Sequence, residues 1–356
     1  MAYTAIDDPS AYFKVQLYTG DGAANHAITF DDTDTDMQPD LVWIKNRDTT
    51  DSHCVFDAVR GATEVIYSNA STAGATDTDT LDSFTSDGFQ VDADVKVNTD
   101  TEKYVAWNWK ANGSGSANTD GSISSTVSVS ATSGFSIVKF TTDSDSGNAT
   151  IGHGLGVVPK MIIQKNTEQN YNWEVFHESV TSGGVGRMIL NTTAALDTVN
   201  DPFGEVAPTS SVFTFNQTWN EVIGNDIIAY CFAEKQGFSK FGSYEGNGST
   251  TATGGPFIYT GFSPSFVIIK DVDAVANWEM FDNKRIVAGY PAEMHPHANA
   301  AQSVPPGDRR LYFTSNGFKI DTSHAPPINA SGETYIYLAF AEAPLVNSNG
   351  VPCNAR

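Results

Sequence analysis

The stretch Pro39-Asp-Leu-Val-Trp-Ile-Lys45 occurs in similar form twice more, as Pro159-Lys-Met-Ile-Ile-Gln-Lys165 and Pro264-Ser-Phe-Val-Ile-Ile-Lys270. Each copy starts with a proline, continues with a short apolar run and ends with a lysine. A count of eleven residues then leads from each lysine to a phenylalanine, and each copy follows a strand-like entry. The three phenylalanines are Phe56, Phe176 and Phe281, and the entries begin at Phe13, Phe135 and Phe241. Such equal spacings indicate three internal repeats.

The repeats have the composition of β-strands rather than helices. Their apolar runs are short, rich in Val, Ile, Phe, Tyr and Trp, and bounded by Gly, Pro, Asn and Asp. Ser86-Asp-Gly-Phe89 and Ser315-Asn-Gly-Phe318 place Asp-Gly and Asn-Gly between apolar neighbours, which is typical of tight hairpin turns. We therefore predict an all-β protein with three tandem homologous β-sandwich-like domains.

The repeats also define the predicted domain boundaries. In order, we expect an N-terminal arm at 1–11, β repeat domain 1 at 12–110, a Gly/Ser/Thr-rich linker at 111–134, β repeat domain 2 at 135–234, β repeat domain 3 at 235–342 and a C-terminal tail at 343–356. Within the linker, residues 123–129 alternate enough to form one further strand.

The charge of the chain argues against two classes of partner. Its 20 Lys and Arg against 42 Asp and Glu give a formal net charge of −22 at pH 7. A surface this acidic repels phosphate backbones and anionic lipids, so we expect neither nucleic-acid binding nor membrane insertion. The first ten residues have no basic or apolar leader, so we expect synthesis in a cytoplasm without a secretion signal.

Candidate metal ligands occur in two kinds of loop. The acidic residues Asp32, Asp34 and Asp36, and likewise Asp143 and Asp145, could gather oxygen ligands for calcium, but we expect them to form solvated acidic loops, because runs of charge usually only solvate a face. His295-Pro-His297 could supply two imidazoles, although a zinc site needs three or four protein ligands. We therefore expect no metal and no cofactor. No Gly-x-Ser-x-Gly elbow or P-loop occurs, and the prediction is a protein that is not an enzyme.

Several longer motifs resemble a known family. They are Pro39-Asp-Leu-Val-Trp-Ile-Lys-Asn-Arg47, Phe56-Asp-Ala-Val-Arg-Gly61, Tyr104-Val-Ala-Trp-Asn-Trp-Lys-Ala111 and Tyr230-Cys-Phe-Ala-Glu234. These motifs resemble repeat-containing virion structural proteins of tailed bacteriophages, chiefly short-tailed marine ones. The resemblance implies a phage structural protein that is head-associated or tail-associated, and it carries no catalytic residues across. The second repeat departs from it, with Phe176-His177 in place of the Phe-Asp-x-x-Arg form.

These observations predict a non-enzymatic virion protein on the particle exterior. We favour a capsid decoration or knob protein, because no heptad or short-period shaft repeat occurs; the alternative is a tail-associated fibre or host-receptor-binding protein. The expected partners are other virion proteins and a host cell-surface glycan or protein, and we expect a homo-oligomer. We expect Ile6, Asp7, Asp8 and Pro9 to form an anchoring arm that folding does not need. We expect Tyr290, His295 and His297 to form a contact surface in the Pro-rich loop 287–308.

Overall fold

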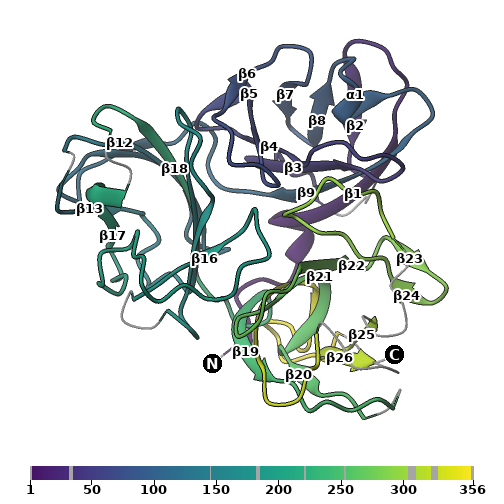
Figure 1. Cartoon of the computed structure of the whole chain (residues 1–356). Coiled ribbons are helices and arrows are strands. Elements are labelled where there is room, and N and C mark those ends of the chain that lie inside the picture. Colours follow the sequence, from purple (N-terminus) through teal and green to yellow (C-terminus); the bar gives the residue numbers. More distant parts are fainter. Residues whose placement is uncertain are drawn as a thin grey trace.

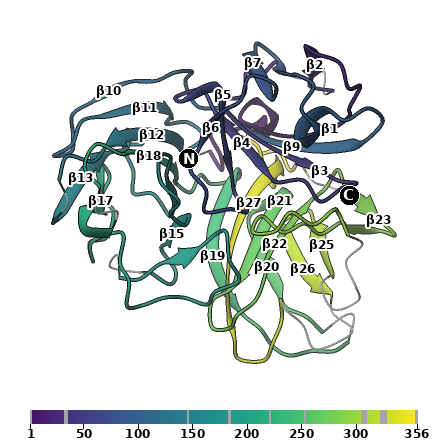
Figure 2. The same cartoon turned by 45° about the horizontal axis from the view of Figure 1, so that its top comes forward.

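The computed structural model describes residues 2–31, 35–144, 146–181, 185–219, 222–251, 254–303, 310–321 and 328–353. It confirms the predicted β-rich class, with 46% of residues in strands, 3% in helices and several antiparallel sheets. Figures 1 and 2 show three groups of strands arranged around a common centre. None of the helices among these residues is long and apolar enough to span a membrane.

The first group contains a six-stranded sheet and a three-stranded sheet. The six strands, in spatial order, are β1 (Phe13–Thr19), β9 (Lys103–Trp109), β3 (Leu41–Asn46), β4 (Cys54–Asp57), β5 (Gly61–Tyr67) and β6 (Ala75–Thr76). The smaller sheet has the order β2 (His26–Thr29), β8 (Gly88–Val91) and β7 (Leu81–Thr85). The short helix α1 (Val95–Asn98) is capped by the Asp94 side chain, which accepts from Lys96 N–H.

The second group has a seven-stranded sheet and a two-stranded sheet. The seven strands are β10 (Ser116–Asn118), β11 (Ser125–Ser130), β12 (Phe135–Thr141), β18 (Asp226–Phe232), β14 (Met161–Asn166), β15 (Glu174–His177) and β16 (Met188–Ile189). The pair is β13 (Asn148–Gly152) and β17 (Val212–Asn216). The expected linker 111–134 therefore supplies two strands of this sheet, and the strand expected at 123–129 lies at 125–130 as β11.

The third group has a four-stranded, a three-stranded and a two-stranded sheet. The four strands are β19 (Ser239–Glu245), β27 (Thr334–Pro344), β21 (Phe262–Asp271) and β22 (Trp278–Asp282). The three strands are β20 (Phe257–Tyr259), β26 (Gly317–Asp321) and β25 (Arg310–Thr314), and the pair is β23 (Ile286–Val287) and β24 (Tyr290–Pro291).

The three large sheets share one order of strands. The orders β1-β9-β3-β4, β12-β18-β14-β15 and β19-β27-β21-β22 each place the last long strand of a group between the entry strand of the repeat (β1, β12 or β19) and the proline-led strand (β3, β14 or β21). The register is also shared, since Leu41 lies opposite Trp109, Met161 opposite Phe232 and Phe266 opposite Phe340. We call positions with the same register in the three groups equivalent.

This register corrects one detail of the predicted repeats, in which Phe13, Phe135 and Phe241 occupy the same position. Phe13 lies opposite Trp109 and Phe135 opposite Phe232, but Ser239, not Phe241, lies opposite Phe340. A shift of two residues keeps every side chain on its face of the sheet, so the alternating pattern alone does not reveal it.

Both faces of the large sheets are covered. In β18, Ile228, Tyr230 and Phe232 point into a core shared by all three groups, whereas Ile227, Ala229 and Cys231 point into a core of the second group alone. Successive side chains of a strand alternate between faces, so these strands are apolar along their whole length. The shared core joins the three groups into one body.

The Asp-Gly and Asn-Gly motifs act differently from the prediction. Thr85 pairs with Gly88 and Thr314 with Gly317, so the turn residues are the two before each glycine. A Cβ at Gly88 would lie 2.0 Å from Ile28 O, and one at Gly317 would lie 2.0 Å from Ile258 O. The glycines therefore allow close approach of the neighbouring strand rather than forming the centre of the turn.

Candidate functional site

Buried polar bonds link the three groups of strands in a ring. The Tyr230 hydroxyl of the second group donates to Asp57 Oδ2 of the first at 2.8 Å, and Asp57 also pairs with Arg60 Nε at 2.6 Å. The Trp107 indole of the first group donates to Asp282 Oδ2 of the third at 3.0 Å. Asp282 in turn pairs with Arg285 Nε at 2.6 Å.

The third link of this ring uses the residue that departed from the repeat pattern. His177 is equivalent to Asp57 and Asp282, and its Nε2 lies 3.3 Å from Tyr337 O of the third group. Its Nδ1 accepts from Ser179 N–H at 3.2 Å, so the tautomer that fits these partners carries its proton on Nε2. Burial lowers the pKa of His177 to about 4.

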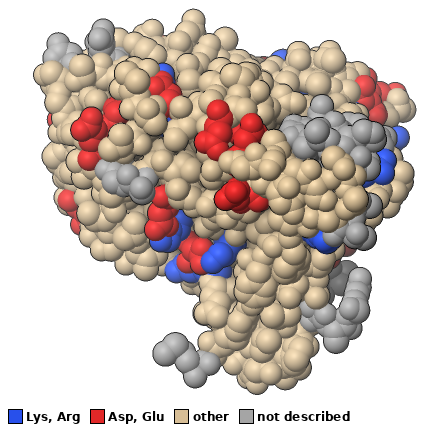
Figure 3. All heavy atoms as spheres, turned by 60° about the horizontal axis from the view of Figure 1, so that its bottom comes forward, with Lys and Arg blue, Asp and Glu red and all other residues tan. Residues whose placement is uncertain are grey.

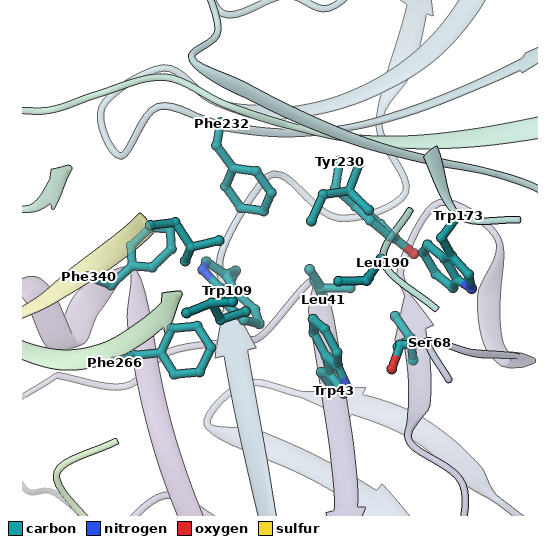
Figure 4. A pocket seen from close by; sticks show the side chains of 14 residues that line it. Leu41, Trp43, Ser68, Trp109, Trp173, Leu190, Tyr230, Phe232, Phe266 and Phe340 are labelled. Atoms are coloured by element: carbon teal, nitrogen blue, oxygen red, sulfur yellow. The ribbon is translucent and has the colours of Figure 1, made fainter. Parts of the chain in front are cut away.

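The centre of the ring is an apolar cavity with a volume of about 20 Å³ (Figure 4). Its walls come from all three groups and include Trp43 and Trp109, Trp173 and Tyr230, and Phe266. A space of this size holds about one water molecule, and an apolar lining gives that water no partner. The cavity is therefore a packing gap where three sheets meet, and it is too small for an organic ligand.

The predicted anchoring arm is packed against the rest of the chain. Ile6 is 3% exposed within the shared core, and Pro9 is buried at the start of a 3-10 helix (Pro9–Ala11). Asp8 accepts from Ser10 N–H at 3.0 Å and from Thr35 Oγ1 at 2.5 Å. Asp7 is bonded to the Ser348 backbone and hydroxyl. Ile6 and Pro9 are thus covered within this chain, so a partner could reach only the polar residues beside them.

The Pro-rich loop packs onto the first group of strands. Ser68 Oγ donates to Pro296 O at 2.7 Å, and Arg47 Nε donates to Gln302 Oε1 at 2.8 Å. His295 is turned toward Glu279 Oε2, 3.1 Å from its Nδ1, and His297 Nε2 lies 3.2 Å from Asn277 Oδ1. We expected His295 and His297 to contact a partner, but both side chains contact residues of this chain.

The two acidic loops fall partly outside the described residues: Asp32, Asp34 and Asp145 lie there. Asp36 and Asp143 are described and exposed. Among the described residues, the one group of three potential metal ligands lies elsewhere and consists of Glu279, Glu293 and His295. Sequence reasoning missed Glu279 because it lies on a different strand from the histidine loop.

An exposed aromatic face lies on the three-stranded sheet of the third group, together with Tyr290 of the neighbouring strand β24. We use this name for Phe257, Tyr259, Tyr290 and Tyr312. Phe257 and Tyr259 are 47% and 53% exposed on β20, and Tyr312 is 38% exposed on β25. Tyr312 lies across β26 from Phe257, because both pair with Lys319. Rings that remain half exposed on one sheet offer flat apolar surface to a partner.

Polar groups border the aromatic face. The Tyr312 hydroxyl donates to the Tyr290 hydroxyl at 2.6 Å, and the Tyr290 hydroxyl donates to Asp321 Oδ2 at 3.0 Å. The two rings lie 4.9 Å apart, and the Arg310 guanidinium lies 4.4 Å from the Tyr290 ring centroid. Tyr290, predicted as a contact residue, is therefore part of this face.

The first group shows that the fold does not require these aromatic residues. Its small sheet has the same register, with Ile28 opposite Phe89 where the third group has Ile258 opposite Phe318. The positions equivalent to the exposed aromatic residues are small or polar, and Ala27, Thr29 and Ser83 stand where the third group has Phe257, Tyr259 and Tyr312. The aromatic face is thus specific to the third group.

Charged side chains are sparse on one face of the molecule. On the face shown in Figure 3, acidic and basic residues form small separate groups with wide uncharged areas between them. Uncharged surface of this kind suits contact with neutral partners such as sugars or other proteins.

The fold and this surface describe an all-β protein in which three like sheets enclose one core and one outer sheet carries an aromatic face. The chain belongs to the family described as "Domain of unknown function (DUF7483)", whose model matches residues 8–344. The match covers all three groups of strands. No curated protein and no solved structure matches the chain.

Proposed function

We propose that this chain is a non-enzymatic virion structural protein on the exterior of a tailed bacteriophage, where it decorates the capsid. The resemblance of its repeat motifs to phage virion proteins supports this role. The observation that carries the decoration role is the shared core, which joins three sheets into one body with no shaft among the described residues. A knob of this kind offers a broad rigid surface, and its net charge of −22 favours solubility at high copy number.

We further infer that the three groups are tandem homologous domains. Their common strand order, the shared register and the three equivalent lysines support this inference. Lys45, Lys165 and Lys270 are all buried, and each donates from Nζ to loop carbonyls of Thr49, Gln169 and Ala276, respectively. Identical use of a buried lysine at three equivalent places is typical of repeated units.

The second candidate function is host adhesion through a cell-surface glycan, and the aromatic face favours it. Tyrosine and phenylalanine rings stack on the apolar faces of sugars, while a bordering carboxylate such as Asp321 accepts from sugar hydroxyls. This role would place the protein at the tail. Both roles are compatible with other virion proteins as partners, with a homo-oligomer and with assembly in the host cytoplasm.

Immunogold electron microscopy of purified virions distinguishes the two roles. Label over the whole head, with a copy number per particle in the tens to hundreds by gel densitometry, would support decoration. Label at a single vertex with a dozen copies or fewer would reject decoration and support adhesion. Absence of the protein from purified virions would overturn the virion proposal itself.

Adhesion is tested directly by binding of the purified protein to host cells and to isolated host glycans. Tyr259→Ala and Tyr312→Ala should each weaken binding about two- to tenfold, since stacking on one ring contributes roughly 0.5 to 1.5 kcal/mol. The matched controls Thr29→Ala and Ser83→Ala alter equivalent positions of the first group and should leave binding unchanged. Equal binding by all four variants would exclude the aromatic face as the adhesive site.

A further inference from the structure

The strands that follow the proline-led strand place three side chains together in each group of strands. Cys54, Glu174 and Glu279 are equivalent, because they lie opposite Ile44, Gln164 and Ile269. Each of these three partners stands three residues after the equivalent positions Leu41, Met161 and Phe266. The next segment of chain supplies the second set of equivalent residues, which are Val65, Arg187 and Glu293. Each directly precedes the residue that pairs with the preceding strand, in the pairs Ile66–Val55, Met188–Val175 and Met294–Met280. Ten residues further along the chain, Ala75 pairs with Val65, Asp197 with Arg187 and Ser303 with Glu293.

The first group fills this place with apolar side chains. Cys54 and Val65 are both fully buried, and burial raises the pKa of the Cys54 thiol far above its usual range. The fold therefore does not require charges at these positions.

The second group fills the same place with a compensated set of ions. Arg187 Nη1 lies 2.6 Å from Glu174 Oε1, and Arg187 Nε lies 3.2 Å from Asp197 Oδ2. The guanidinium also stacks 4.1 Å from the Trp219 ring centroid. A central arginine thus neutralises the buried Glu174 carboxylate.

The third group places a second carboxylate where the arginine stands. Glu279 is 1% exposed and Glu293 is 3% exposed, and His295 extends toward both. One potential ligand atom from each of the three residues lies within 4.8 Å of the other two. Glu279 Oε1 has no hydrogen-bond partner among the described residues, although it is buried. Lys270 does not fill this role, because its ammonium donates to Ala276 O and Thr193 O.

We propose that Glu279, Glu293 and His295 form a binding site for a divalent transition-metal ion. An ion at this place would balance the buried Glu279 carboxylate as Arg187 balances that of Glu174 in the second group. Imidazole with two carboxylates is a ligand set that suits zinc and related first-row metals, whereas calcium prefers six or more oxygen ligands. Three protein ligands leave a further coordination position for water.

The surroundings of these residues resemble those of metal ligands in general. His295 Nδ1 lies 3.2 Å from Trp278 O and 3.1 Å from Glu279 Oε2, and its Nε2 lies 3.9 Å from Glu293 Oε1. An Nδ1–H bond to the Trp278 carbonyl would direct Nε2 toward an ion beside Glu293. Ser303 Oγ donates to Glu293 Oε1 at 2.6 Å and holds that carboxylate. His295 is 15% exposed at its side chain, which gives the site a short path to solvent. The site is independent of the proposed virion role.

Equilibrium dialysis against zinc, with metal content measured by mass spectrometry, tests the proposal. The full chain is prepared without an affinity tag, carries Cys353→Ser to remove its exposed thiol, and is stripped with a chelator. We expect it to bind about one zinc per chain at neutral pH. Loss of a ligand, in Glu279→Gln or Glu293→Val, should weaken zinc binding by about tenfold or more. Glu293→Val reproduces the apolar residue of the first group, so we expect it to fold.

Matched controls use the second group. Glu174→Gln and Asp197→Asn change equivalent positions and should leave zinc affinity unchanged, with circular dichroism confirming the fold of each variant. Bound zinc should also raise the unfolding temperature of the parent chain and not that of Glu293→Val. Failure of the parent to take up zinc, equal uptake by Glu279→Gln and Glu293→Val, or uptake of calcium in preference to zinc would overturn the proposal.

Discussion

The hydroxyl of Tyr230 donates a 2.8 Å hydrogen bond to Oδ2 of Asp57, 173 residues earlier in the chain. Asp57 is fully buried and already paired with Arg60, and its Oδ1 accepts from the backbone of Val59 and Arg60. The bond therefore joins the central strand of the second sheet to a turn that the first group fixes by itself.

Removing this hydroxyl should destabilise the whole body rather than one group of strands. For Tyr230→Phe we expect a loss of about 1.5 to 3 kcal/mol in the free energy of unfolding, because the bond is made to a buried charged group. Urea denaturation followed by tryptophan fluorescence measures this change. Tyr259→Phe removes an exposed hydroxyl and is the control; a loss no larger than that of the control would contradict the prediction.

Ile6 should contribute to stability although it precedes the first strand. For Ile6→Ala we expect a loss of about 2 to 5 kcal/mol, since the substitution leaves a gap in the shared core. The outcome differs from that of a free arm, whose truncation would leave the unfolding midpoint unchanged. Asp7→Asn alters the neighbouring exposed residue and should have a much smaller effect.

Stability should fall as the pH is lowered from about 6.5 to 4. The pKa values of His177 and His297 are lowered by burial to about 4, whereas an unfolded histidine titrates near 6.5. In this window the unfolded state binds more protons, so the free energy of unfolding decreases with falling pH. His295 works in the opposite direction, because Glu279 raises its pKa, but its effect lies mainly above pH 6.5. His177→Asn should flatten the decrease; an unchanged slope would show that His177 does not cause it.

Stability should rise as the pH is raised from about 8 to 10. Burial lowers the pKa of Lys45, Lys165 and Lys270 to about 8, whereas an unfolded lysine titrates near 10.4. Between these values the folded state loses its protons first, which favours folding with rising pH. Each single Lys→Met substitution should remove about a third of the rise. Buried tyrosines, with raised pKa values, reverse the trend only above about pH 10.

The three-fold repetition was predictable, because proline, lysine and phenylalanine recur at equal spacings. The all-β class followed from the short apolar runs bounded by turn residues. The shared core was not predictable, since an apolar residue such as Tyr230 shows only that a face is buried and not what covers it. The offset between Phe241 and Ser239 was hidden for a related reason, because strand patterns repeat every second residue.

The candidate sites were predicted only in part. Tyr290 and His295 were found from the loop, but their partners Asp321 and Glu279 lie 31 and 16 residues away along the chain and come together through strand pairing. Phe257 and Tyr259 carried a usable signal, because two aromatic residues flanking Ile258 occupy the face of a strand opposite its buried side.

The common strand order and register let one polypeptide surround a shared core with three like sheets that differ in sequence. In a trimer of identical chains, every substitution appears at all three equivalent positions at once. Here each group of strands has its own sequence, so the equivalent residues Cys54, Glu174 and Glu279 can have different surroundings: an apolar core, an ion pair with arginine and a cluster of potential metal ligands. Two groups of strands can thus keep their packing while the third acquires a new surface or ligand.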